Sequence, residues 1–96
     1  MIKDNQPLPE KRLFDLKNMK GIHARVAAKI VQTAEPFDVE ATISYRNMTV
    51  PLLSIMGLLM LSARKDARVE IHAQGPQAQE LFQALHDLFD RKFDEE

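Results

Sequence analysis

The spacing of the apolar residues changes repeatedly along the chain, and this succession is what most constrains the fold. Short strand-like segments alternate with segments of helical spacing. The strand candidates are residues 12–16, 39–45, 48–52 and 68–73, and the helix candidates are residues 24–34, 54–63 and 76–89. The strands and helices follow the order β-α-β-β-α-β-α. Because two of the strands are joined by a hairpin, the strands cannot all be parallel. The sequence therefore predicts an α+β fold with a mostly antiparallel sheet and the helices packed on one face.

The length of 96 residues suits one small domain. Residues 1–11, with two prolines among polar neighbours, are expected to form a flexible leader. Residues 12–90 should form the domain, and residues 91–96 a solvated acidic tail. Arg46 and Asn47 should supply the hairpin turn, because asparagine tolerates a left-handed backbone.

Charge and composition exclude several functions. The 13 basic and 14 acidic residues give a formal charge of -1, and the strands lack interleaved basic and aromatic residues, so nucleic-acid binding is not expected. The absence of cysteine excludes disulfides and thiolate metal sites and favours a reducing cytoplasm. The longest apolar stretch, residues 50–61, falls short of the roughly 20 residues that a membrane-spanning helix needs, so no membrane insertion is expected.

The three histidines, His23, His72 and His86, lie in different predicted elements without ligand-like spacing. No glycine-rich phosphate-binding loop of the G-x-x-x-x-G-K-[ST] type occurs either. We therefore expect no metal site, no cofactor and no kinase activity.

The segment KGIHARVAAKIV places His23 and Arg25 where a polar loop becomes a helix. The start of a helix leaves backbone N–H groups without partners and attracts anions. A phosphoryl group on the His23 ring would face these groups, for which we name Ala24, Val26 and Ala27, and Arg25 could close over it. In the simpler alternative, His23 is a polar cap and Arg25 a solvated side chain, since histidines at helix starts are common and H-x-R is a weak pattern.

The combination of GIHARVAAKIV, a hairpin and then SIMGLLML resembles the HPr family, the histidine-containing phosphocarrier proteins of the bacterial phosphoenolpyruvate-dependent phosphotransferase system. The resemblance extends from about Leu13 to Phe89 in the same element order. It implies an open-faced β-sandwich of four antiparallel strands and three helices. It also implies a cytoplasmic, monomeric carrier of phosphoryl groups for sugar transport that is not itself an enzyme.

The resemblance also implies roles for particular residues. His23 would accept the phosphoryl group from enzyme I and pass it to IIA-type acceptors, and Arg25 would contact the phosphate. Ser54 would be the serine that an HPr kinase/phosphorylase modifies in many members. The surface that docks on partners would consist of Ile55, Met56 and Leu59.

Some of these residues have simpler alternatives. A serine just before a helix is an ordinary N-cap, and an apolar helix is more often core than interface. The chain also has Val26 where the family usually has proline, and Leu53 where many members have lysine. These departures keep a second function open, in which an HPr-like regulatory module binds other proteins under the control of Ser54 phosphorylation, with little or no phosphoryl transfer.

Overall fold

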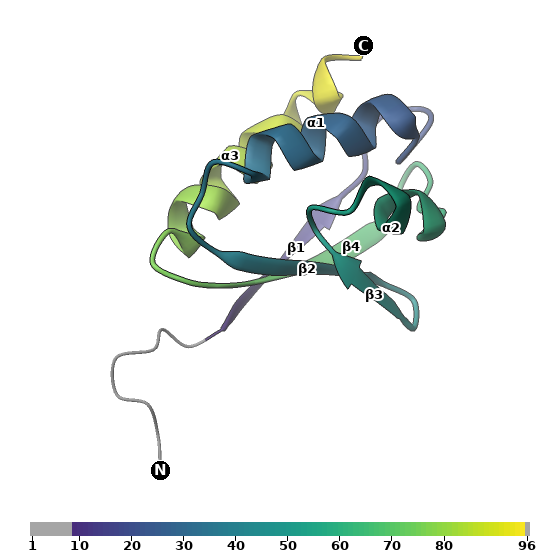
Figure 1. The fold of residues 1–96 in the computed structure, drawn as a ribbon. Helices are drawn as coiled ribbons and strands as arrows, with labels where there is room; N and C mark the ends of the chain where they lie inside the picture. The colour runs from purple at the N-terminus through teal and green to yellow at the C-terminus, as the bar shows by residue number, and fades with distance from the viewer. Residues whose placement is uncertain (1–8, 96) are drawn as a thin grey trace.

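The computed structural model describes residues 9–95 of the chain (Figure 1). Its elements, in chain order, are β1 (Glu10–Asp15), α1 (Ala24–Ala34), β2 (Glu40–Tyr45), β3 (Met48–Pro51), α2 (Ile55–Met60), β4 (Arg68–Gln74), α3 (Ala78–Asp90) and a final turn, η1 (Lys92–Asp94). The predicted element order is confirmed, although β1 begins at Glu10 rather than at Arg12. Residues 1–8 of the expected leader lie outside the described residues.

The four strands form one antiparallel sheet in the order β1-β4-β2-β3. Cross-strand partners such as Phe14 with Val69 and Ile43 with Ile71 are buried, so one face of the sheet is apolar. Helices α1 and α3 lie side by side over this face, and α2 lies next to α1 on the β3 side (Figure 1). This is the predicted α+β, open-faced arrangement, with three helices on one face of the sheet.

The turn between β2 and β3 corrects one expectation. Arg46, rather than Asn47, has the positive backbone angle, with φ of 48°. A positive φ is uncommon for arginine. The guanidinium carbon of Arg46 lies 5.2 Å from the centre of the Tyr45 ring, and this cation–π contact offsets part of the backbone strain.

Helix α2 is shorter than the predicted segment 54–63 because both of its ends are capped. Ser54 stands outside the helix as its N-cap, and its Oγ accepts a hydrogen bond of 2.9 Å from the Gly57 N–H. Ser62 has a φ of 54°, and a left-handed residue just beyond the last turn ends an α-helix. A Cβ at Gly57 would lie 2.8 Å from the Cβ of Val50, so glycine lets α2 approach β3 closely.

Residues 91–95 do not form the solvated tail that the sequence predicted, and residue 96 lies outside the described residues. Phe93 is fully buried, and the centre of its ring lies 4.7 Å from that of Phe89, which in turn lies 5.0 Å from that of Phe14. The expectation was wrong because one phenylalanine among charged residues gives only a weak apolar signal. Burial of Phe93 brings the end of the described chain over α1 (Figure 1).

Residues 9–95 include neither a membrane-spanning helix nor a cluster of metal-binding side chains. None of their helices has the length and apolar character that crossing a membrane requires. Nor do these residues include a group of three or more His, Cys, Asp or Glu side chains that could hold a metal ion.

Candidate functional site

The loop before α1 is fixed by Gly21. This residue has a φ of 66°, and a Cβ there would overlap the Ala63 carbonyl oxygen and lie 2.5 Å from the Arg64 Cα. Glycine is therefore required both by the left-handed backbone and by the close approach of the α2–β4 loop. The next residue, Ile22, is buried, and its N–H donates a hydrogen bond of 2.9 Å to the Ala63 carbonyl. Together these contacts fix the backbone that carries His23.

His23 occupies the N-cap position of α1. Its backbone is extended, and its carbonyl accepts a hydrogen bond of 2.8 Å from the Ala27 N–H. The imidazole makes no capping hydrogen bond to the helix. Instead, its Nε2 lies 2.5 Å from Oε2 of Glu95, while 31% of the side chain remains exposed. The ring therefore does not serve as a polar cap, whereas the exposed Arg25 agrees with the other part of the simpler alternative, a solvated side chain.

The same geometry corrects one of the predicted phosphate-binding positions. The Ala27 N–H already makes the first hydrogen bond of the helix, to His23, and is not available for an anion. The groups left without an intrahelical partner are those of Ala24, Arg25 and Val26. The Val26 side chain is fully buried, so valine at this position both keeps its N–H and contributes to the core.

A fully buried asparagine connects the loop before His23 to the C-terminal turn. The Nδ2 of Asn18 donates to the Gly21 carbonyl at 2.8 Å and to Oε1 of Glu95 at 3.0 Å. The Oδ1 of Asn18 has no hydrogen-bond partner among the described residues. Because one amide group bonds both segments, it sets the position of the Glu95 carboxylate relative to the histidine.

Lys29, on the second turn of α1, also holds the C-terminal turn. Its Nζ donates to the Phe93 carbonyl at 3.0 Å and lies 3.4 Å from Oδ2 of Asp94. Arg91 also contacts Asp94, with 2.9 Å between Nε and Oδ1, and these contacts hold the pKa of Asp94 below its usual range. Neither Asn18 nor Glu95 was expected from the sequence to be part of the site. The one sequence feature that could have indicated a packed C-terminal turn was the four-residue spacing of Phe89 and Phe93.

Opposing effects act on the Glu95 carboxylate. Burial by itself would raise its pKa, but hydrogen bonds from Asn18 and His23, and the charges of His23 and Arg25, outweigh burial. The pKa of Glu95 is therefore lowered.

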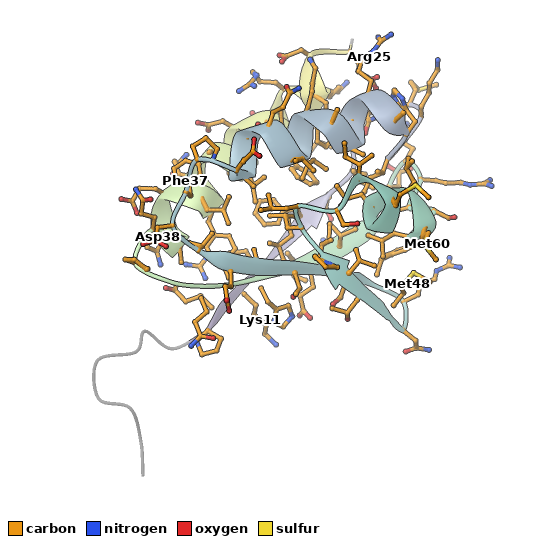
Figure 2. All side chains as sticks on the ribbon, viewed as in Figure 1. Lys11, Arg25, Phe37, Asp38, Met48 and Met60 are labelled. Atoms are coloured by element: carbon orange, nitrogen blue, oxygen red, sulfur yellow. The ribbon has the colours of Figure 1, made fainter. Side chains whose placement is uncertain are left out.

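Arg25 is exposed, and Figure 2 shows its side chain projecting from the start of α1 away from the sheet. Its guanidinium is accordingly accessible to an anion brought to the helix start.

Helix α2 presents part of its apolar surface to solvent. Ile55 is 42% exposed and Met56 is 71% exposed, whereas Leu59 is half-buried against the core. Five further large apolar side chains are exposed among the described residues: Leu13, Met19, Met48, Leu53 and Met60. Met60 lies on α2 in Figure 2, on the side of the molecule where β3 forms the edge of the sheet.

The fold and the site define a small open-faced α+β protein that presents a histidine, held by a carboxylate, at the first turn of a helix. The PTS-HPr family model, described as "PTS HPr component phosphorylation site", matches residues 10–91. The phosphocarrier protein HPr of Chlamydia trachomatis is 39% identical over 83 residues, which are 86% of this chain and 76% of that protein. The phosphocarrier protein HPr of Xylella fastidiosa is 35% identical over 79 residues, covering 82% of this chain and 89% of that protein.

Solved structures give the same result. The crystal structure of HPr-C-His from Thermoanaerobacter tengcongensis has a TM-score of 0.86 and 37% identity, covering 91% of this chain and 98% of that one. A phosphocarrier protein HPr from Bacillus anthracis has a TM-score of 0.79 and 28% identity, covering 84% and 96%. The chain therefore belongs to the HPr family of phosphocarrier proteins of the phosphotransferase system. The predicted resemblance is confirmed, and a phosphocarrier of this kind is not an enzyme.

Proposed function

We propose that this chain accepts a phosphoryl group on His23 from enzyme I and passes it to IIA-type acceptors in the cytoplasm. The observation that carries the proposal is the position of His23. Its ring is partly exposed at the start of α1, beside the N–H groups of Ala24, Arg25 and Val26. Family membership supplies the reaction class, and this residue supplies a nucleophile next to an anion site.

The ring nitrogen that reacts follows from the contact with Glu95. A carboxylate only accepts hydrogen bonds, so the Nε2 that lies 2.5 Å from it carries the proton. The lone pair then resides on Nδ1, which attacks phosphorus while the bond to the donor breaks and its electron pair leaves with the donor. Arg25 and the free N–H groups stabilise the charge on the phosphoryl oxygens.

Partner docking is assigned to Ile55, Met56 and Leu59. The exposure of Ile55 and Met56 supports this assignment, because exposed methionine adapts to differently shaped partners. The test is Met56→Glu, which should weaken phosphoryl transfer from enzyme I at limiting concentration. Leu13→Glu is the matched control, because Leu13 is 59% exposed on the edge strand β1, at the opposite end of the sheet from β3. Equal effects of the two substitutions would argue against docking through α2.

Ser54 supports a second candidate function, the gating of partner binding by an HPr kinase/phosphorylase. Ser54 directly precedes the exposed Ile55 and Met56, so a phosphate there would change the charge of this surface. Its Oγ also caps α2, which gives the serine a structural role whether or not it is modified. The test is whether the protein is phosphorylated on incubation with ATP and such a kinase, with Ser54→Ala as the control. Phosphorylation of the wild type but not of Ser54→Ala would support gating, and no phosphorylation would leave Ser54 as a helix cap alone.

Intact-protein mass spectrometry tests the main proposal. The protein is incubated with phosphoenolpyruvate and enzyme I, including the enzyme I of the same organism. One acid-labile phosphate should be added to the wild type and none to His23→Ala. His86→Ala, which removes an exposed imidazole from α3, is the matched control and should be phosphorylated normally. Phosphorylation of His23→Ala would overturn His23 as the acceptor. No phosphorylation of the wild type with any enzyme I would overturn the carrier function and leave the second function, an HPr-like regulatory module that binds other proteins.

A further inference from the structure

The C-terminal turn has an unusual backbone conformation that specific contacts hold in place. Lys92, Phe93 and Asp94 all have positive φ angles, of 56°, 56° and 63°. Left-handed backbone is unfavourable for residues with a Cβ, so three in succession persist only where other contacts hold them. Those contacts are the buried Phe93 ring and the hydrogen bond from Lys29 to the Phe93 carbonyl.

The result of this turn is the placement of the Glu95 carboxylate. Its side chain is only 12% exposed, and each of its oxygens has a partner. Oε1 accepts a hydrogen bond from the buried Asn18, and Oε2 lies against Nε2 of His23. The carboxylate is therefore oriented by one side chain and directed at another.

We propose that Glu95 is a positioning residue for phosphoryl transfer, a role that rests on the proposed function of His23. The carboxylate holds the proton on Nε2, keeps the lone pair on Nδ1 and turns the ring so that Nδ1 faces the helix start. It also stabilises the positive charge that the ring acquires when Nδ1 becomes bonded to phosphorus.

The proton balance shows why the contact assists transfer in both directions. When the N–P bond forms at Nδ1, the proton stays on Nε2, and the ring becomes a phosphorylated imidazolium facing a carboxylate. When the group moves to an acceptor nucleophile, the N–P bond breaks, its electron pair returns to Nδ1 and the ring is again neutral. Glu95 remains ionised throughout, so no proton has to leave or enter the site through it.

The geometry also favours assistance over blockage. Glu95 contacts Nε2, which lies across the ring from Nδ1, so the carboxylate does not occupy the position of the incoming phosphoryl group. Asn18 holds the other carboxylate oxygen and keeps it from turning toward Nδ1.

The test compares Glu95→Gln with Glu35→Gln, which removes one exposed carboxylate at the far end of α1. The first measurement is the rate of phosphoryl acceptance from phosphorylated enzyme I in a single turnover. We expect a loss of about 10- to 100-fold for Glu95→Gln, the rate equivalent of one hydrogen bond to a charged group. Glu35→Gln should change the rate by less than about twofold, the scale of surface substitutions.

The second measurement is the NMR resonance of the His23 Nε2 proton in the unphosphorylated protein. It should lie far downfield in the wild type and in Glu35→Gln, and move upfield in Glu95→Gln, because a neutral amide is a weaker acceptor. A merely structural role for Glu95 would not move this signal.

Each result has a defined meaning. An unchanged rate in Glu95→Gln overturns the proposal, and a faster rate overturns it in favour of a tail that blocks the site. An unshifted proton resonance shows that the contact with Nε2 does not form. If the wild type accepts no phosphate, the carrier function itself fails, and the positioning role fails with it.

Discussion

The Nε2 atom of His23 and the Oε2 atom of Glu95 lie 2.5 Å apart although the two residues are 72 positions apart in the chain. This contact joins the start of α1 to the last described turn, and Asn18 bonds to the same carboxylate. The geometry of the histidine therefore depends on how firmly the C-terminal turn is anchored.

Replacing Phe93 by alanine should destabilise the fold and release Glu95. Phe93 is fully buried against Phe89, and removing a buried phenylalanine costs about 3–5 kcal/mol. Urea unfolding measures the loss. Phe37→Ala is the control, because Phe37 is only partly buried and should lose less free energy. The downfield Nε2 proton of His23 should also disappear in Phe93→Ala alone. Its persistence would mean that Glu95 stays in place without the aromatic anchor.

Gly21→Ala should destabilise the loop that carries His23. Alanine in the left-handed region costs about 1–2 kcal/mol, and its Cβ would also overlap the Ala63 carbonyl oxygen. The expected loss in the free energy of unfolding is therefore larger than that strain alone. Lys20→Ala, at the exposed neighbouring position, should change stability by less than about 0.5 kcal/mol. A Gly21→Ala protein as stable as Lys20→Ala would contradict the close approach of the two loops.

Ser54→Ala should lower stability by about 1 kcal/mol, because the Gly57 N–H loses its side-chain acceptor. Ser54→Asp is the matched variant, since aspartate is also a good N-cap and keeps an acceptor at the helix start. Urea unfolding should rank the wild type close to Ser54→Asp and both above Ser54→Ala. Equal losses in the two variants would mean that the hydroxyl acts through something other than the cap.

Local patterns made the fold predictable. Val69, Ile71 and Ala73 alternate with polar residues because β4 has one buried face, and this period identifies a strand without any tertiary knowledge. Most helix boundaries followed from similar signals, such as Pro36 beyond α1 and the cap at Ser54. His23 and Arg25 were identified as site candidates because they stand together at the start of one helix.

The rest of the site depends on contacts between distant parts of the chain. Asn18 is a fully buried amide in a loop, and Glu95 belongs to an acidic segment, so neither residue has a periodic signal. Ala27 was named among the anion-binding groups because the first hydrogen bond of a helix depends on where the N-cap falls. With His23 as the cap, the Ala27 N–H donates that bond to the His23 carbonyl.

The last prediction concerns pH. Burial alone would raise the pKa of Glu95, but hydrogen bonds from Asn18 and His23 and nearby positive charge lower it below its ordinary value of 4.5. The folded state therefore favours the ionised carboxylate, and its stabilising contribution is complete above about pH 4.5, the value expected in the unfolded chain. The contribution is lost as the pH falls through the lower pKa of the folded protein. Urea unfolding of the wild type and Glu95→Gln across the acidic range measures this contribution as the difference between their free energies of unfolding. This difference should be constant near neutral pH and shrink in acid. An NMR titration of the Glu95 carboxyl carbon with a midpoint above 4.5 would contradict the prediction and the ionised contact with His23.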